Sequence, residues 1–149
     1  SFINKNCYSK IPNFKEFKNE DKLLYNDLIV KIPTLKNMMN NQDLNNYVKE
    51  VIDFSFKANK YFNDLEPWSL KKSNPERMNT ILYTILNQIR SISILLNPII
   101  PNSTTKILNI MGIKEKEKNL KNIEDHMFLK PGTDIKKIDI LFKKIEHDN

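Results

Sequence analysis

Apolar residues recur every three or four positions through much of this chain, which is the spacing of helices that bury one face. The first such stripe lies in residues 19–39. Its apolar positions are Leu23, Leu24, Leu28, Ile32 and Leu35. Pro33 falls inside this helix, and we expect a kink or a break there, because proline lacks the amide N–H and its ring crowds the preceding turn.

A second amphipathic segment follows, with Asn41 as its expected N-cap and its end near Asp64. The positions expected to face the core are Leu44, Val48, Val51, Ile52, Ser55, Ala58 and Phe62. The charged positions fall mostly on the other side of the helix and are Lys49, Glu50, Asp53, Lys57 and Lys60. This pattern predicts a helix that buries one face and exposes the other.

The third helix has the clearest start signal in the sequence. Ser73 and Glu76 stand three residues apart, as in a capping box, which places Ser73 at the N-cap. Pro75 suits the first turn, where a missing N–H costs nothing. The expected core stripe then runs to Pro98 through Met78, Ile81, Leu82, Ile85, Ile89, Ile92 and Leu96.

A fourth helix is predicted from about Ser103 to Gly112, where glycine is the natural residue after a helix end. Residues 113–149 are charged and irregular, with a turn at Lys130-Pro131-Gly132-Thr133 and one or two short helical turns. We therefore predict an all-α fold, an antiparallel helix bundle over residues 1–112. We expect residues 113–149 to form a charged C-terminal extension.

The first residues suggest that the chain is part of a longer protein. The sequence begins at Ser1 without an initiator Met, and residues 1–6 read as the last turn of a helix whose start is missing. The single Cys7 excludes an internal disulfide and any site built from several cysteines, which is typical of a reducing compartment. No run of apolar residues is long enough to span a membrane, and we expect a cytoplasmic protein.

Positive charge is concentrated in the middle of the chain. The whole sequence carries a formal net charge of +6. Residues 57–106 supply about +4 of this excess, from seven basic and three acidic side chains. This segment surrounds Pro67 and Trp68, and a clustered excess favours a nucleic-acid footprint over a uniformly solvated surface.

Trp68 is the only tryptophan and follows a proline at the predicted exit of a helix. From spacing alone, a core tryptophan is the commoner interpretation. An exposed aromatic in a basic segment instead suits single-stranded RNA, whose unpaired bases stack on aromatic rings.

Catalytic chemistry is hard to find in this sequence. His126 and His147 are far apart in the polar extension, where surface histidines are the usual outcome. Cys7 has no partner that marks a nucleophile. No catalytic residue and no metal ligand is assigned.

Four blocks of residues, in order, resemble the anticodon-binding domain of methionyl-tRNA synthetases. The first is the opening Phe2-Ile3-Asn4-Lys5, and the second joins Ala58-Asn59-Lys60-Tyr61 to Pro67-Trp68. The third is Pro98-Ile99-Ile100-Pro101 with Ser103, Thr104 and Gly112. The last joins Gly132-Thr133-Asp134-Ile135 to residues 140–146, where Lys143 and Lys144 depart from the Pro and Arg that the family often carries.

This resemblance implies a role for particular residues. Trp68 would pack on or read the wobble cytosine of the CAU anticodon, with Pro67 fixing its backbone and Asn59 as a weaker candidate. The expected RNA-binding set is Trp68, Pro67, Asn59, Lys60, Lys71 and Lys72. The family's further Asn and Arg anticodon contacts would lie before Ser1.

The resemblance also implies an activity for the intact enzyme, which would form methionyl-adenylate from methionine and ATP and then acylate tRNA(Met). Its catalytic domain would hold ATP and a zinc ion, whereas this segment would hold no cofactor. The implied partners are the tRNA(Met) anticodon stem-loop and the enzyme's own catalytic domain, with no membrane. The resemblance also implies that residues 113–149 pack on the bundle or on that catalytic domain, which is absent from this chain. Two alternatives remain, namely a helical domain of another class Ia synthetase and a helical protein-interaction module. The block from Asn59 to Trp68 argues against the first.

Overall fold

The computed structural model describes residues 10–135 of the chain. Every regular element in this range is helical, which confirms the all-α prediction there. The long helices are α2 (Asn19–Asn40), α3 (Leu44–Leu65) and α4 (Pro75–Leu96). The shorter elements are η1 (Pro67–Leu70), α5 (Pro101–Ile110), η2 (Glu115–Glu117) and α6 (Leu120–Ile123). The expectations for residues 1–6 and for residues 136–149 lie outside the described residues.

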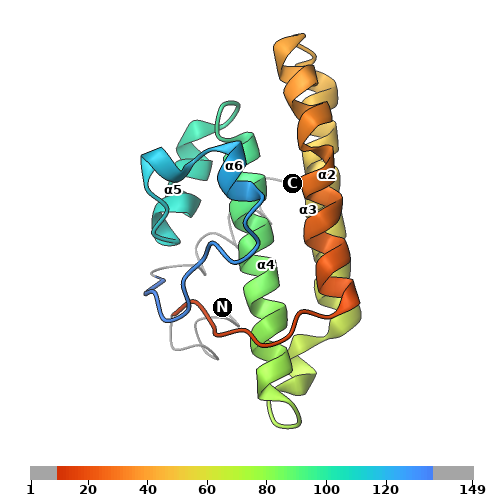
Figure 1. Ribbon diagram of the computed structural model, residues 1–149, viewed down its shortest axis with the longest axis vertical. Helices are drawn as coiled ribbons and strands as arrows, with labels where there is room; N and C mark the ends of the chain where they lie inside the picture. Colours follow the sequence, from red (N-terminus) through yellow and green to blue (C-terminus); the bar gives the residue numbers. More distant parts are fainter. Residues whose placement is uncertain (1–9, 136–149) are drawn as a thin grey trace.

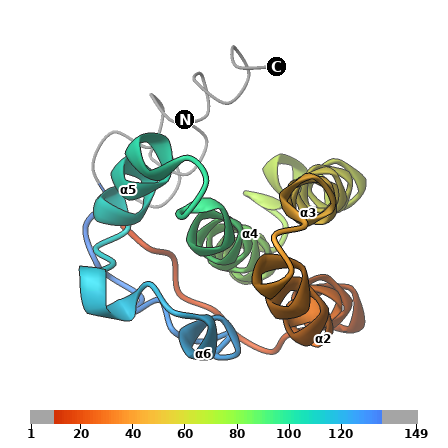
Figure 2. The ribbon, with the colours of Figure 1, turned by 90° about the horizontal axis from the view of Figure 1, so that it is seen from above.

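The three long helices run antiparallel, and α4 is the central one. Figure 1 shows α4 with α2 and α3 on one side and α5 and α6 on the other. Viewed along the bundle, α4 lies between α5 and the α2–α3 pair (Figure 2). It contacts α2, α3, η1, α5 and α6. Because neighbours surround it, α4 is buried around most of its circumference rather than along one stripe.

The face that α3 buries differs from the predicted one. Its core residues are Tyr47, Val51, Phe54, Ala58 and Tyr61. Leu44 and Ile52, which were expected in the core, are exposed, and that part of the prediction is wrong. The helix is rotated so that its large aromatic side chains fill the gap against α4, since an aromatic ring buries more apolar area than a leucine or isoleucine.

The predicted stripe of α2 is confirmed at Leu24, Leu28, Ile32 and Leu35 and is wrong at Leu23, which is exposed. A break at Pro33 is also wrong, because α2 continues to Asn40. The proline ring is exposed, while Ile32 and Leu35 on either side of it are buried. Packing of these neighbours against the core outweighs the loss of one backbone hydrogen bond.

Two predicted helix starts are one or two residues early. The cap of α4 is Asn74 rather than Ser73, because the Asn74 side chain accepts a hydrogen bond from the Arg77 amide at 3.2 Å. Asn41 does not start α3 but closes α2, since its amide donates to the carbonyl of Asn37. Asp43 is the residue that precedes α3.

The end of α5 at Gly112 is confirmed, whereas its start lies at Pro101 rather than at Ser103. Gly112 has a φ of +76°. Its amide donates to the carbonyl of Asn109 at 3.0 Å, and the Ile113 amide donates to Leu108 at 2.8 Å. These two bonds make the Schellman motif that a glycine after a helix end allows.

The described part of the extension lies against α4. It contains the two short helical turns that were predicted, and a turn at residues 130–133 in which the Thr133 amide donates to the Lys130 carbonyl. Backbone hydrogen bonds of 2.8 Å join Ile11 to both Gly132 and Thr133, so the N-terminal segment and the extension are paired. The domain boundary at residue 112, and packing on a catalytic domain, stay predictions.

Candidate nucleic-acid interface

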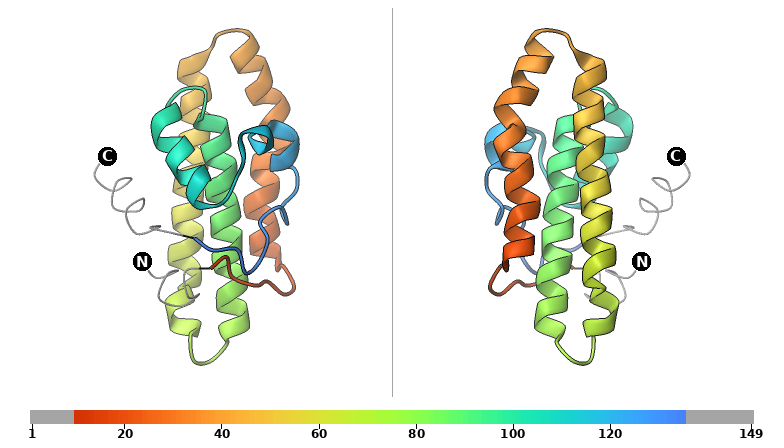
Figure 3. Two further views of the ribbon diagram at one scale, coloured as in Figure 1. Left: turned by 90° about the vertical axis from the view of Figure 1, so that its left-hand side faces the viewer. Right: turned by 90° about the vertical axis from the view of Figure 1, so that its right-hand side faces the viewer.

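A sharp corner joins α3 to α4 at one end of the bundle. Figure 3 shows this corner at the opposite end of the long helices from the α2–α3 turn. Glu66 adopts the left-handed conformation, with a φ of +45°, and its amide donates to the Phe62 carbonyl at 3.2 Å. A proline disfavours the helical conformation in the residue before it, so Pro67 ends α3 here.

Trp68 lies on this corner and is not a core residue, since 45% of its surface is exposed. Its ring packs on that of Phe62, with 5.4 Å between ring centroids and 56° between the ring planes. One side of the indole is therefore supported by protein, and the remainder faces solvent. Such a supported, partly exposed aromatic ring suits stacking against a planar group.

The backbone that carries Trp68 is fixed from both sides. Pro67 is buried, and η1 packs against α4. The Ser69 hydroxyl donates to the Glu66 carbonyl at 2.7 Å, and the Asn74 amide donates to the Leu70 carbonyl at 2.9 Å. Pro67 is thus a buried part of this corner, and its role in fixing the backbone of Trp68 stays a prediction.

The other candidate residues are exposed around the same corner. Lys71 and Lys72 follow η1 directly, and neither lies within ion-pair distance of a carboxylate in residues 10–135. Lys60 forms an ion pair with Asp64 on α3, at 2.6 Å. Asn59 is exposed on the same helix, three residues before Phe62. The structure therefore places all six candidates on the last turns of α3 or just beyond them.

The basic footprint is smaller than the sequence suggests. Arg77 and Arg90, both counted in the excess of residues 57–106, are buried. Lys57 and Lys60 are paired with Asp53 and Asp64 on their own helix. Net sequence charge did not distinguish these structural cations from accessible ones. Of the candidate lysines, Lys71 and Lys72 keep their charge available to a ligand.

A buried carboxylate beneath the corner was missed by the sequence analysis. Asp21 is fully buried and lies in the first turn of α2. It accepts hydrogen bonds from the Tyr61 hydroxyl, from the Lys18 amide at 2.9 Å, and from two nitrogens of Arg77 at 2.6 and 3.0 Å. Arg77 also pairs with Glu20 at 3.1 Å. Four donors satisfy the lone pairs of this carboxylate.

This environment shifts the pKa values of Tyr61 and Arg77. Burial raises the pKa of Tyr61 well above its ordinary value, and the hydrogen bond to Asp21 adds to that rise. Burial alone lowers the pKa of Arg77, but the hydrogen bond and charge of Asp21 outweigh it, and the pKa is raised. Neither residue changes charge near neutral pH. The group is a fixed ion pair rather than an acid–base catalyst.

The possible metal ligands and His126 were also located in the described residues. Residues 10–135 contain no group of three His, Cys, Asp or Glu side chains placed to hold a metal ion, so they provide no donor set for zinc. His126 is half buried rather than free on the surface, and it stacks on Tyr25 with 4.3 Å between ring centroids. None of the helices in the described range combines the length and the hydrophobicity that a membrane span needs.

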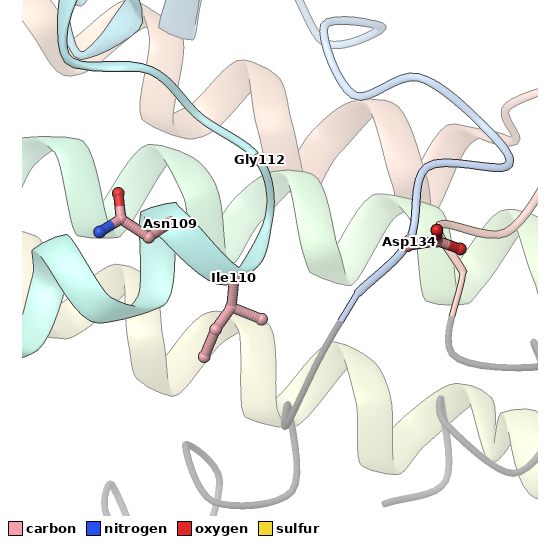
Figure 4. A pocket seen from close by; sticks show the side chains of 4 residues that line it. All are labelled: Asn109, Ile110, Gly112 and Asp134. Atoms are coloured by element: carbon pink, nitrogen blue, oxygen red, sulfur yellow. The ribbon is translucent and has the colours of Figure 1, made fainter.

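A shallow hollow of about 260 Å³ lies elsewhere, at the end of α5. Figure 4 shows Asn109, Ile110, Gly112 and Asp134 around it. It offers one carboxylate and one amide, without a cation or an aromatic ring among these four residues. It is therefore a poor site for a nucleic acid, and the corner at Trp68 is the better candidate.

Comparison with known proteins agrees with the helical fold. Residues 11–149 match the family described as the anticodon binding domain of methionyl tRNA ligase. The methionine–tRNA ligase of Rickettsia felis is 33% identical over 168 residues, which cover 98% of this chain and 33% of that protein. The corresponding enzyme of Brucella melitensis is 34% identical, over 75% of this chain and 22% of its own length.

Solved structures give the same result. The ligand-free Mycobacterium tuberculosis methionyl-tRNA synthetase superimposes with a TM-score of 0.83 at 27% identity, over 91% of this chain and 28% of that one. A second structure of the same enzyme, in complex with methionyl-adenylate, matches with a TM-score of 0.83. This chain spans about a third or less of the length of these relatives. It belongs to the family of anticodon-binding domains of methionyl-tRNA ligases.

Proposed function

We propose that this chain recognises the CAU anticodon loop of tRNA(Met), with Trp68 stacking on an anticodon base. The observation that carries the proposal is the exposed Trp68 ring, supported on one side by Phe62 and held on a fixed corner. Unpaired bases in an RNA loop stack on such rings. Pro67 sets the backbone, and Asn59 supplies an amide that is free to bind a base edge.

Electrostatics support the same surface. Lys71 and Lys72 stand beside Trp68 with no described carboxylate paired to them. Two accessible cations next to a stacking ring suit a loop whose phosphates flank the exposed base. Lys60 can bind a phosphate only when its ion pair with Asp64 opens, so it contributes less to RNA binding.

The intact protein, by its family, would charge tRNA(Met) with methionine through methionyl-adenylate, using ATP. By the same proposal, the catalytic domain that carries out this chemistry and holds a zinc ion would lie outside this chain. The role of the present chain is to bind and position the tRNA. Since charged tRNA serves translation, a cytoplasmic location follows from the same proposal.

The test measures binding of fluorescent stem-loops that carry CAU or altered anticodons. We expect the CAU loop to bind more tightly than the altered loops. Trp68→Ala should weaken CAU binding by about 5- to 150-fold, the equivalent of about 1–3 kcal/mol for one stacked base. Phe56→Ala, which removes an exposed aromatic ring from α3, is the control and should leave the affinity unchanged.

Salt dependence separates RNA binding from a protein-interaction surface. Log affinity should fall with log salt concentration, and Lys71→Ala or Lys72→Ala should each reduce the slope by about 0.7. Equal binding of all loops by the wild-type protein and by Trp68→Ala would rule out the proposed role of the corner. Binding without salt dependence would favour the interaction module.

A further inference from the structure

Both ends of the segment that carries Trp68 are attached to one buried side chain. Tyr61 lies seven residues before Trp68, and Arg77 lies nine residues after it. Both donate hydrogen bonds to the carboxylate of Asp21, Tyr61 through its hydroxyl and Arg77 through its guanidinium. Asp21 belongs to a third helix, α2, whose first turn lies at the same end of the bundle as the corner (Figure 3).

We propose that Asp21, Tyr61 and Arg77 are positioning residues, which together hold the Trp68 ring in the orientation that accepts a base. This inference rests on the function proposed for Trp68. None of the three side chains is expected to contact RNA, because all three are buried. They act through the backbone of the last turns of α3 and the first turn of α4.

The path from Tyr61 to the tryptophan ring is short. Phe62 is the next residue along α3, and its ring makes the tilted contact with the Trp68 indole. The Tyr61 side chain is anchored at its tip by Asp21 and packs with Ala58, Ile81 and Ile85 in a small core cluster. Fixing the rotation of α3 at Tyr61 therefore also fixes the direction in which Phe62 presents its ring.

Arg77 holds the other end of the segment. It is the third residue of α4, and two of its nitrogens bond to Asp21 while one of them also reaches Glu20. This bidentate geometry restricts both distance and angle. The corner between Tyr61 and Arg77 is thus closed into a loop by a carboxylate that comes from a different helix.

A purely structural network would stabilise the bundle without any special effect on Trp68. Another buried tyrosine of the same helix provides the comparison. Tyr47 is as buried as Tyr61, and its hydroxyl donates to the Leu95 carbonyl at 2.5 Å. It lies fourteen residues before Tyr61, so about 20 Å of helix separates the two. Tyr47→Phe and Tyr61→Phe each remove one buried hydroxyl and keep the ring.

The experiment uses Trp68 as its own probe, because it is the only tryptophan. Indole emission and acrylamide quenching are recorded for both variants at temperatures where melting curves show them folded. We expect Tyr61→Phe to shift Trp68 emission to longer wavelength and to increase its quenching, while Tyr47→Phe leaves both unchanged. Asp21→Asn, which keeps the size of the side chain but not its charge, should cause the same shift of Trp68 emission and the same increase in quenching as Tyr61→Phe.

RNA binding supplies the second measurement. Tyr61→Phe should weaken binding of the CAU stem-loop by about 5-fold, which equals about 1 kcal/mol, and should reduce the preference for CAU over altered loops. Tyr47→Phe should change neither. Equal effects of the two variants on Trp68 emission, or no effect of either, would overturn the positioning role.

The two proposals fail in different ways. If Trp68→Ala binds the CAU loop as the wild type does, the proposed function fails, while the emission measurements still decide whether Asp21 and Tyr61 hold the ring. If Tyr61→Phe shifts the Trp68 emission but leaves the preference for the CAU loop intact, the network positions the ring, but the orientation of the ring does not select the loop. That result overturns the inference that the network holds Trp68 in the orientation that accepts a base.

Discussion

The guanidinium of Arg90 donates a hydrogen bond to the backbone carbonyl of Asn122, with 2.8 Å between nitrogen and oxygen. The same group donates to the carbonyl of Asp125 at 2.9 Å and to the side-chain oxygen of Asn87. Its carbon lies 4.7 Å from the centroid of the Phe128 ring. A residue that adds to the basic count of the sequence thus serves to attach residues 122–128 to the central helix α4.

Replacing Arg90 should destabilise the protein strongly. Arg90→Ala leaves two backbone carbonyls and the Asn87 amide oxygen without their donor, and we expect a loss of about 2–5 kcal/mol in the free energy of unfolding. Urea titration followed by circular dichroism gives this value. Lys106→Ala, which removes an exposed cation, should stay within about 0.5 kcal/mol of wild type. Equal losses in both variants would contradict a structural role for the guanidinium.

Replacement of two phenylalanines that stand two residues apart on α3 should affect stability very differently. Phe54 is 2% exposed and belongs to the main core, whereas Phe56 is 65% exposed. Phe54→Ala creates a cavity and should cost about 3–5 kcal/mol of stability. Phe56→Ala should change stability by less than about 0.5 kcal/mol. Thermal melts of the two variants test which face α3 buries. A larger loss of stability in Phe56→Ala than in Phe54→Ala would show that α3 buries a different face in solution.

Gly112 should tolerate asparagine better than alanine. Its φ of +76° is strained for a residue with a Cβ atom, but the added atom would meet only Thr133 at an ordinary 3.7 Å. Gly112→Ala should therefore cost about 1–2 kcal/mol from backbone strain alone. Gly112→Asn should cost less, because asparagine adopts this conformation more readily. An alanine variant as stable as wild type would show that the turn has another conformation in solution.

Ionisation of Tyr83 should contribute a loss of stability in alkaline solution. Burial raises its pKa to about 12, although the charge of Arg90 opposes that rise. An unfolded tyrosine loses its proton near pH 10, so between about pH 10 and 12 the unfolded state binds fewer protons than the folded state. The free energy of unfolding must then decrease with rising pH, by at most about 1.4 kcal/mol per unit for this group.

Comparison with Tyr83→Phe isolates that contribution. Arg90 acts with the opposite sign, since burial lowers its pKa to about 10 and the folded state loses that proton first. Arg90 is buried in both proteins, whereas only the wild type has an ionisable group at position 83. The urea midpoints of the wild type and of Tyr83→Phe, measured at pH 9, 10 and 11, should therefore converge as pH rises, because the wild type loses more stability. Parallel curves would contradict the raised pKa.

The periodicity of the sequence was sufficient to locate the helices. In residues 10–135, the order of the long helices, the stripe of α4, and the helix end at Gly112 all follow from local rules of spacing and capping. The precise rotation of α3 did not follow, because Tyr47 and Tyr61 carry hydroxyls and look less apolar than Leu44 or Ile52. Their hydroxyls find partners at Leu95 and Asp21, which only the neighbouring helices supply.

The candidate interface was also only partly predictable from the sequence. The sequence alone determined that a lone tryptophan follows a proline at a helix exit, since chain geometry before proline is a local property. Only the tertiary structure decided that Trp68 is exposed, that Arg77 and Arg90 are buried, and that Asp21 lies beneath the corner. Burial and pairing depend on contacts between residues distant in the chain, and a linear pattern of charge and hydrophobicity does not contain those distances.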